Sequence, residues 1–244
     1  MTLELKNPHS LLAVLETRPG DVAEIRLSGR SPRGAWEEVA TKAGGLKIPV
    51  HVGGPVGGRR DRSRDGGRSQ VAVGVVRERS GVGLAELWTG INEDGRGIWL
   101  ALDRLQDPHN VGAIFRTAAF FGVRGILLTK NQSAPLSGTA YDVASGGLEH
   151  VPFTIVSNLA RALQQARDAG LWVLGTSERG TQDLDEVDHE RNWLVVIGSE
   201  ERGLRRLTLE HCDVVSRVSA RGAIASLNAS VATAVVLSTL CRSG

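Results

Sequence analysis

The sequence of 244 residues has little of what several large protein classes depend on. Its two cysteines, Cys212 and Cys241, form no CxxC pair, which excludes a disulfide framework and a cysteine-rich zinc site and suits a reducing compartment. No run of about 18 apolar residues predicts a membrane-spanning helix, and the first residues lack the pattern of a secretory signal. We therefore expect a soluble, cytoplasmic protein.

Motifs of several common enzyme classes are missing as well. The sequence contains no GxxxxGKS/T phosphate loop, no GxGxxG turn after a first strand, no HExxH and no GxSxG. The six histidines are scattered, so no metal site is expected. These absences argue against a kinase, a dinucleotide-dependent dehydrogenase, a zinc hydrolase and a serine hydrolase.

What the sequence does contain changes along the chain. Lys and Arg number 29 against 27 Asp and Glu, so the overall charge does not indicate a polyanionic partner. Arginine is concentrated instead in "GGRRDRSRDGGRS", residues 57–69, which holds five Arg against two Asp. Because this region is rich in glycine and poor in apolar residues, it predicts an exposed, mobile loop over residues 53–69.

Residues 1–77 predict a small α/β domain that contains this loop. The expected elements are helices at 9–17 and 34–44 and strands at 21–28, 48–52 and 71–76. The weakly patterned segment 78–97 is interpreted as a linker to a second domain, residues 98–244.

In the second domain, apolar strands alternate with helices. Strands are expected at 97–102, 125–129, 171–176, 192–198 and 213–219. Near-continuous apolar strands between helices predict a parallel sheet covered on both faces, and such sheets bind ligands at the carboxyl ends of their strands. The segments "LGTSERG", "IGSEERG" and "VSARGAIASLN" occupy that position, and each contains a glycine that lets a ligand approach the backbone.

The stretch "NVGAIFRTAAFFG", residues 110–122, combines an amide and a guanidinium with an otherwise apolar helix. Asn110 and Arg116 would point about 240° apart on one helical wheel, so we expect Asn110 in the loop or cap before the helix. Taken alone, Asn110 is compatible with an ordinary cap. Arg116 alone is compatible with a surface side chain that reaches water over apolar surface.

Two further blocks follow expected strands. In "VVIGSEERG", Gly198 and Gly203 frame Glu200 in a tight loop, where the carboxylate could simply be solvated. In "ARGAIASLNASVATAVVLSTL", Ser226 or Asn228 would cap a long apolar helix that belongs to the core. Each block by itself is compatible with ordinary structure.

Taken in order, the three blocks resemble the motifs of the SpoU family of SPOUT methyltransferases, which are knotted RNA ribose 2′-O-methyltransferases. The matching patterns are Asn-x-Gly-x-x-x-Arg, Gly-x-Glu-x-x-Gly and Ser-Leu-Asn, and the resemblance covers residues 98–242. Within the family, phrases such as "LDRLQDPHNVGA", "TSERG" and "SLNASVATA" are similar to those of bacterial 23S rRNA guanosine 2′-O-methyltransferases.

The resemblance implies a role for the first block. The family transfers a methyl group from S-adenosylmethionine to a ribose 2′-hydroxyl, which is a poor nucleophile until its proton leaves or its alkoxide is stabilised. Arg116 is implied to lie beside this oxygen. Because a guanidinium stays protonated in proteins, we favour Arg116 as a cation that grips a phosphate and stabilises the alkoxide, while solvent or a phosphate oxygen takes the proton.

Further site residues follow from the same resemblance. Asn110 would orient Arg116 or the ribose, Glu200 would hold the guanidinium or a loop, and Asn228 would hydrogen-bond the nucleotide. The positions that match the family's cofactor contacts are Thr176, Gly198, Val218 and Leu227.

The implied fold is an α/β, SPOUT-type parallel sheet with a C-terminal trefoil knot. The site of this family forms at a dimer interface, so we expect a homodimer in which the apolar C-terminal helix is partly buried against its partner.

The first 77 residues are similar to the small ribosomal-protein L30e-like RNA-binding domain that these enzymes carry. Candidate RNA contacts are His9 and four loop arginines, Arg59, Arg60, Arg62 and Arg64, because arginine neutralises phosphate and releases counterions. The alternatives are a solvated loop and, for His9, a capping or surface role.

The sequence departs from the family pattern in three places. Glu201 stands where Gly is common, Val218-Ser219-Ala220 replaces Ile-Pro-Met, and "NPHS" lacks the family's Gly. Two other functions are compatible with the sequence. One is 2′-O-methylation of a tRNA or of an rRNA in antibiotic resistance, and the other is a non-catalytic RNA-binding or ribosome-assembly role.

Overall fold

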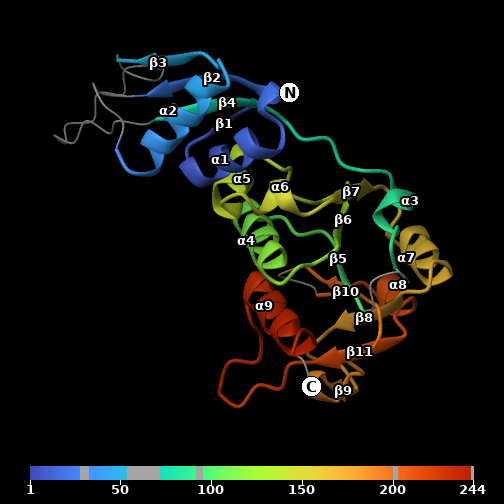
Figure 1. Ribbon diagram of the computed structural model, residues 1–244. Helices are drawn as coiled ribbons and strands as arrows, with labels where there is room; N and C mark the ends of the chain where they lie inside the picture. Colours follow the sequence, from blue (N-terminus) through green and yellow to red (C-terminus); the bar gives the residue numbers. More distant parts are fainter. Residues whose placement is uncertain (28–32, 54–71, 92–95, 200–202, 243–244) are drawn as a thin grey trace.

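A computed structural model of the chain describes residues 1–27, 33–53, 72–91, 96–199 and 203–242. Over these ranges the chain builds a four-stranded sheet before residue 78 and a seven-stranded sheet after residue 97. Figure 1 shows the smaller sheet at one end of an elongated molecule, next to the helices that cover one face of the larger sheet.

The smaller sheet has the strand order β1-β4-β2-β3. Its strands are β1 (Thr2–Leu5), β2 (Val22–Leu27), β3 (Val50–Val52) and β4 (Val73–Arg77). β4 runs antiparallel to both of its neighbours, whereas β2 and β3 are parallel. The helices are α1 (Pro8–Thr17) and α2 (Ala35–Gly45), with the short helix η1 (Pro19–Asp21) between α1 and β2. A side chain at Gly74 would lie 2.5 Å from Leu11, so the glycine lets α1 pack closely on β4.

The larger sheet is parallel throughout, in the order β7-β6-β5-β10-β8-β11-β9. Its strands are β5 (Ile98–Leu102), β6 (Gly125–Thr129), β7 (Phe153–Val156), β8 (Trp172–Thr176), β9 (Gln182–Asp183), β10 (Trp193–Ile197) and β11 (Val214–Arg217). The predicted α/β class and parallel sheet are confirmed. All carboxyl ends therefore meet at one edge of the sheet.

Helices cover both faces of this sheet, as the continuous apolar strands predicted. They are α3 (Leu84–Leu87), α4 (Pro108–Phe120), α5 (Gly138–Ala144), α6 (Gly147–His150), α7 (Leu159–Asp168), η2 (Leu184–Glu186), α8 (Arg206–Leu209) and α9 (Ala229–Leu240). In β5, Leu100 and Leu102 pack in the core that contains α4 and α9, whereas Trp99 and Ala101 pack in the core that contains α3 and α7. Alternating residues of one strand thus serve two cores.

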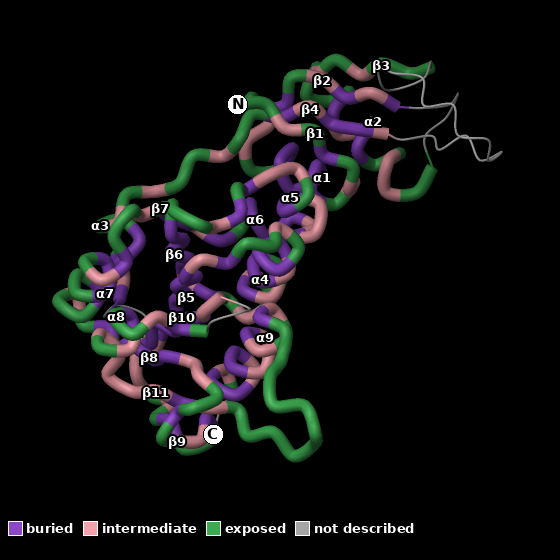
Figure 2. Tube along the Cα trace, turned by 180° about the vertical axis from the view of Figure 1, so that it is seen from behind, coloured by how far each residue is buried: buried purple, intermediate pink, exposed green. Residues whose placement is uncertain are grey.

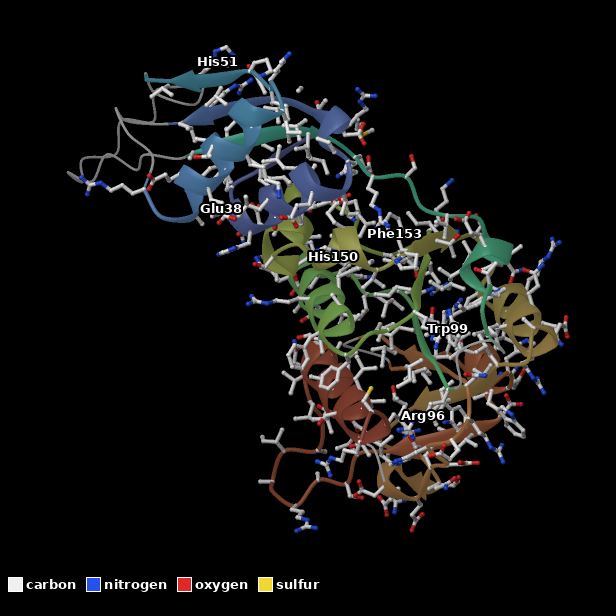
Figure 3. All side chains as sticks on the ribbon, viewed as in Figure 1. Glu38, His51, Arg96, Trp99, His150 and Phe153 are labelled. Carbon is white, nitrogen blue, oxygen red and sulfur yellow. The ribbon has the colours of Figure 1, made fainter. Side chains whose placement is uncertain are left out.

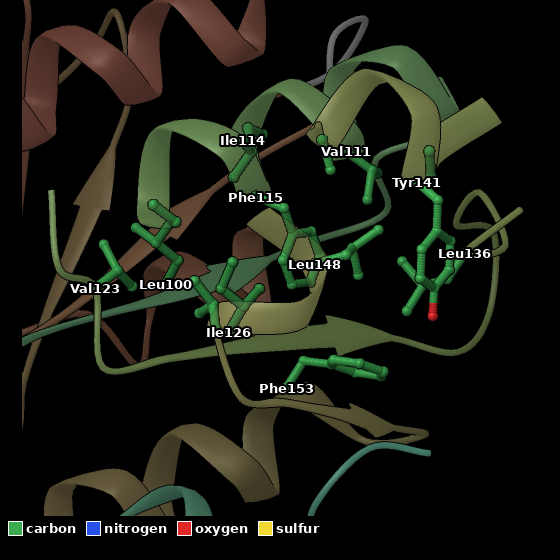
Figure 4. Close-up of a cluster of buried hydrophobic side chains, with 14 of the residues drawn as sticks. Leu100, Val111, Ile114, Phe115, Val123, Ile126, Leu136, Tyr141, Leu148 and Phe153 are labelled. Atoms are coloured by element: carbon green, nitrogen blue, oxygen red, sulfur yellow. The ribbon is translucent and has the colours of Figure 1, made fainter. Parts of the chain in front are cut away.

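The core beneath α4 fixes that helix on the sheet. Figure 4 shows Ile114 and Phe115 directed from α4 toward side chains of the strands and of α6. Both side chains are fully buried, and the rings of Phe115 and Phe153 meet edge to face with centroids 5.9 Å apart. The opposite side of α4 is therefore free to carry polar residues.

The structure also corrects details of the predicted element order. β1, β7 and β9 were not predicted, because they are short and lie beside stronger helical patterns. Residues 138–150 form two helices rather than one, because Ser145 and Gly146 have φ of 50° and 98° and break the helix between them.

The segment 78–97 connects the smaller sheet to the larger one, and part of it packs against the larger sheet. It contains α3, and Leu87, Trp88 and Ile91 are buried against α7 and β8. Figure 3 labels Trp99, whose indole N–H donates to the carbonyl of Leu87 at 2.9 Å. The interpretation of this segment as a linker therefore needs one addition, because Leu87, Trp88 and Ile91 belong to the core of the larger sheet.

Polar contacts join the N-terminal part to α5 and α6. Asp142 accepts hydrogen bonds from the backbone N–H groups of Lys6 and Asn7, both at 2.9 Å. Arg18 binds Glu149 through two nitrogens at 2.8 and 2.9 Å, and the Glu149 side chain is only 1% exposed. The smaller sheet is thus held against the larger one by charged groups that are removed from water.

Among the described helices, none combines the length and the apolar character that crossing a bilayer requires.

Candidate active site at the carboxyl edge of the sheet

Three neighbouring strands bring predicted cofactor residues to one edge. Thr176 ends β8, Gly198 follows β10 and Val218 follows β11, and these strands lie in the order β10-β8-β11. The register pairs Val196 with Gly175 and Ser216 with Thr176, so the strand ends are level. The Thr176 hydroxyl donates to the Val196 carbonyl at 3.0 Å. The structure therefore brings these three residues together, as their positions after strands predicted.

The loop after β10 closes on itself at Gly198. A side chain there would lie 2.5 Å from the Leu204 nitrogen, closer than real atoms approach. Ser199 and Gly203 pair through backbone hydrogen bonds of 3.2 and 2.9 Å, and Gly203 has φ of 62°. The predicted tight turn framed by Gly198 and Gly203 is confirmed. Glu200 lies outside the described residues.

The loop between β11 and α9, residues 218–228, is exposed along its whole length (Figure 2). It nevertheless carries three large apolar side chains, with Val218 37%, Ile224 77% and Leu227 49% exposed. A run of exposed apolar residues at a ligand-binding edge is typical of a surface that a ligand or partner covers. Leu227 thus belongs to the same loop as Val218.

Ser219 stands where the family pattern has a proline, and the structure shows what the serine contacts. Its hydroxyl donates to Asp183, which also pairs with Arg217 at 3.1 Å. The hydrogen bond from Ser219, followed by the charge of Arg217, lowers the pKa of Asp183. These contacts hold the start of the exposed loop against β9. A proline in place of Ser219 would restrict the backbone of the loop instead of forming these contacts.

Asn228 caps α9, which confirms one of the two caps predicted. Its Oδ1 accepts from the Ser230 N–H at 2.9 Å, the Ser230 hydroxyl at 2.6 Å and the Val231 N–H at 3.4 Å. These bonds all use the carbonyl oxygen of the amide. The NH₂ group of Asn228 is the part of the side chain that remains suited to a substrate oxygen.

Asn110 is not the cap that the sequence predicted. Asp107 occupies that position and accepts from the His109 N–H at 2.9 Å, while Pro108 begins the helix. Asn110 therefore lies in the first turn of α4, where it is 6% exposed. The prediction was wrong because Asp107 is an equally good cap and a proline prefers the first helical position.

Two glycines set the position of Arg116. A side chain at Gly112 would lie 2.5 Å from the Ala140 carbonyl oxygen, and one at Gly147 would lie 2.8 Å from the Arg116 Cα. α5 and α6 can therefore approach the backbone of α4. Gly112 thus has a packing role, and Arg116 lies beside α6.

Arg116 is exposed and lines a cavity of about 480 Å³ formed by α4, α5 and α6. His150, labelled in Figure 3 at the end of α6, lines the same cavity. His150 could not be singled out beforehand, because one histidine at a helix end belongs to no motif. Within the described residues, neither Thr176, Gly198, Val218 nor Leu227 lines this cavity. Arg116 and these cofactor residues therefore do not share this cavity.

The predicted RNA contacts are only partly described. His9 is exposed in the first turn of α1, and its backbone N–H donates to the capping Asn7 at 2.9 Å. Arg59, Arg60, Arg62 and Arg64 lie outside the described residues, as does most of the loop 53–69.

Neither cysteine has the lowered pKa that a reactive thiol requires. Burial, followed by the charge of Asp213, raises the pKa of the Cys212 thiol to about 12. Burial also raises the pKa of Cys241. Across the part of the chain that the structure describes, no three His, Cys, Asp or Glu side chains gather as metal ligands would.

The family to which the chain belongs follows from comparison with known proteins. The model of the SpoU rRNA Methylase family matches residues 97–238. The chain is also 37% identical over 243 residues to the 23S rRNA (guanosine-2′-O-)-methyltransferase RlmB of Pseudomonas aeruginosa, covering 96% of this chain and 94% of that protein. The chain belongs to the SpoU rRNA methylase family. RlmB of Bordetella pertussis is 36% identical and covers 94% of this chain and 92% of its own length.

Solved structures show the same fold as this SpoU family member. The AdoMet-bound rRNA methyltransferase from Sinorhizobium meliloti matches with a TM-score of 0.75 and 23% identity, over 98% of this chain and 86% of that one. The SpoU methyltransferase AviRb from Streptomyces viridochromogenes, in complex with AdoMet, matches with a TM-score of 0.77 and 21% identity, over 99% and 90%. At these identities the likeness establishes the fold.

Proposed function

We propose that this chain methylates a ribose 2′-hydroxyl in RNA with S-adenosylmethionine as methyl donor, and that its substrate is a guanosine of 23S rRNA. RlmB relatives at 34–37% identity over nearly the whole chain support the reaction and the RNA. The observation that carries the proposal is the meeting of Thr176, Gly198 and Val218 at one edge of the parallel sheet.

The residues at this edge fit S-adenosylmethionine. The loop that begins at Gly198 would offer backbone groups to the polar parts of the cofactor, and Val218 and Leu227 offer exposed apolar surface to adenine. When bound, the cofactor supplies a methyl group on a sulfonium sulfur. We further propose that the loops after β8, β10 and β11 form the trefoil knot of the SPOUT fold, which the exchange of strand order β10-β8-β11 allows.

Arg116 would act on the 2′-oxygen as a fixed cation. Within the described residues its guanidinium has neither an ion pair nor a hydrogen bond, so its donors are available to a phosphate and to a developing alkoxide. The proton passes to solvent or to a phosphate oxygen. Asn110, in the same helix, would orient Arg116 or the ribose. Glu200 would hold the catalytic loop, and the NH₂ group of Asn228 would bind the nucleotide.

A homodimer would complete this site. In one chain the cavity beside Arg116 is separate from the cofactor residues, and apolar side chains around it are exposed. Phe120 at the end of α4 is 83% exposed, and Val231 on the adjacent α9 is 49% exposed. Pairing through this face would cover both side chains and bring Arg116 of one subunit toward the cofactor loops of the other.

The N-terminal part would select the RNA. We propose that residues 1–77 form an L30e-like RNA-binding domain, that 78–97 connect it and that 98–244 form the methyltransferase domain. His9 and the loop arginines Arg59, Arg60, Arg62 and Arg64 would contact the RNA backbone. The enzyme would act in the cytoplasm, where its two free thiols stay reduced.

The test is transfer of a radiolabelled methyl group from S-adenosylmethionine to RNA by the purified chain. We expect label in transcribed 23S rRNA, at a guanosine 2′-oxygen, and none in total tRNA. Label in tRNA alone would assign a different substrate, and calorimetry that detects no cofactor binding would assign a non-catalytic role.

Arg116→Ala should abolish transfer while cofactor affinity and melting temperature stay near those of the native protein. Arg161→Gln, which removes an exposed arginine from α7, is the matched control and should retain activity. Loss of cofactor affinity in Arg116→Ala, rather than loss of turnover, would refute the role given to Arg116.

A further inference from the structure

A second cavity, separate from the one beside Arg116, lies at the carboxyl ends of β5, β6 and β7. Its volume is about 240 Å³, and α7 and α8, which are adjacent in Figure 1, border it. The polar residues that line it are Arg104, Thr129, Asn131, Ser157, Asn158, Arg205 and Thr208. None of them belongs to the three motif patterns, and the proposed reaction uses none of them. The cavity has room for a phosphate and part of its sugar but is smaller than most sites for larger ligands, about 300–1,000 Å³.

The charge of this cavity comes from Arg104. Arg205 is neutralised by the buried Asp103, whose Oδ2 accepts from the Arg205 Nε at 3.0 Å and whose Oδ1 lies 2.9 Å from the Arg205 Nη2. Thr208 also donates to Oδ2 of Asp103, at 2.9 Å. Arg104, by contrast, is half-buried, and within the described residues its guanidinium has no carboxylate or other acceptor. No Asp or Glu is among the described residues that line the cavity.

The backbone of Arg104 is held in an unfavourable conformation. Its φ is 62°, a left-handed value that is unfavourable for a residue with a side chain. The hydrogen bond from its N–H to the Thr129 hydroxyl, at 2.9 Å, holds it there. Glycine or asparagine would adopt this backbone with less strain, so folding alone does not favour arginine at this position. A charge kept at the expense of strain indicates a ligand of opposite charge.

The cavity adjoins the proposed reaction site. The Asp103 N–H donates to the Ile197 carbonyl at 2.9 Å, immediately before Gly198. Arg205 follows the closed turn between Ser199 and Gly203 by two residues. The cavity and the cofactor loop therefore share one short segment of chain, and an RNA strand that presents a ribose to that loop passes along the same sheet edge.

We propose that this cavity binds a backbone phosphate of the RNA strand next to the methylated nucleotide, through the guanidinium of Arg104. The proposal rests on the proposed function for the identity of the strand. Asn131, Ser157 and the first amides of α7, which Asn158 caps, add neutral donors around the phosphate.

The test compares Arg104→Asn with the native protein in binding to full-length transcribed 23S rRNA by filter retention over a series of salt concentrations. We expect the Kd to rise about tenfold, because a charge-assisted contact is lost. The slope of log K against log salt should fall by about 0.7 to 0.9, which corresponds to one phosphate. The melting temperature should stay equal or rise, because asparagine relieves the strain.

Arg104→Lys should retain most of the affinity, and Arg161→Gln, a charge on α7 outside the cavity, should leave the salt slope unchanged. Cofactor affinity should be native in all three variants. An Arg104→Asn protein with native Kd and native slope overturns the proposal.

A measurement with inorganic phosphate distinguishes a cavity that binds the RNA backbone from a cavity that binds a free anion. If phosphate stabilises the native protein but not Arg104→Asn, while both bind RNA equally, the cavity is a free-anion site and the assignment to RNA is wrong. These measurements need no turnover. If the chain fails to methylate RNA, the proposed function is refuted, but the binding experiment can still support or refute the phosphate site.

Discussion

The ion pair between Arg18 and Glu149 predicts how firmly the N-terminal part is held. The Glu149 side chain is 1% exposed, and Arg18 is 14% exposed and donates to it at 2.8 and 2.9 Å. Arg18→Ala would leave a buried carboxylate without its partner, which costs about 3–5 kcal/mol. In a chain of this size each kcal/mol lowers the melting temperature by about 2–4 °C, so we expect a decrease of roughly 6–20 °C.

The matched control is Arg26→Ala. Arg26 also pairs with carboxylates, Glu4 and Glu24, but it is 39% exposed, and such pairs contribute about 0–1 kcal/mol. Both variants would be melted by differential scanning calorimetry in the same buffer. A second control, Arg18→Met combined with Glu149→Leu, should recover most of the loss because no unpaired charge remains. If Arg18→Ala and Arg26→Ala melt within about 2 °C of each other, the buried pair does not hold the two parts together.

Three further predictions follow from the site. Gly198→Ala should weaken S-adenosylmethionine binding at least tenfold by calorimetry, because the new side chain would overlap the Leu204 nitrogen; native affinity would contradict the tight closure of this loop. Phe120→Asp should shift the protein to a monomer in sedimentation and abolish methyl transfer, and an active monomer would show that one chain holds a complete site. Because its pKa is about 12, Cys212 should stay protonated and resist iodoacetamide at pH 8 until urea unfolds the protein, as mass spectrometry would report; equal rates in both states would disprove its burial.

Periodicity predicted the larger sheet well because its strands are unusually uniform. β10 is apolar at every position, β6 is apolar until its final threonine, and both are buried throughout, so they have a pattern that neither a loop nor an amphipathic helix shares. β9, with two residues, is too short to carry a period. Asn110 shows a different limit, because Asp107 and Asn110 are both good caps and only the proline between them decides which one begins the helix.

The arrangement of the site depended on contacts that no local pattern records. Thr176, Gly198 and Val218 could be predicted because each follows a strand, and strand ends of a parallel sheet share one edge. The cavity at Arg104 could not, because residues from four separate segments line it and its charge depends on Arg205 being neutralised by Asp103. The cavity beside Arg116 could not be predicted either, because it forms where α4, α5 and α6 pack together.

The four residues of α6 limit how freely the two halves of this protein can be exchanged with those of other proteins. Glu149 anchors the N-terminal half through Arg18, while its neighbours Gly147 and His150 form the wall beside Arg116. A chimera with a foreign N-terminal half would have to supply an arginine of its own at this point. Without that arginine, the buried carboxylate of Glu149 would have no partner and would disturb α6, which supports the cavity. Such a chimera would lose methylation activity because this helix is displaced, even though every motif is intact.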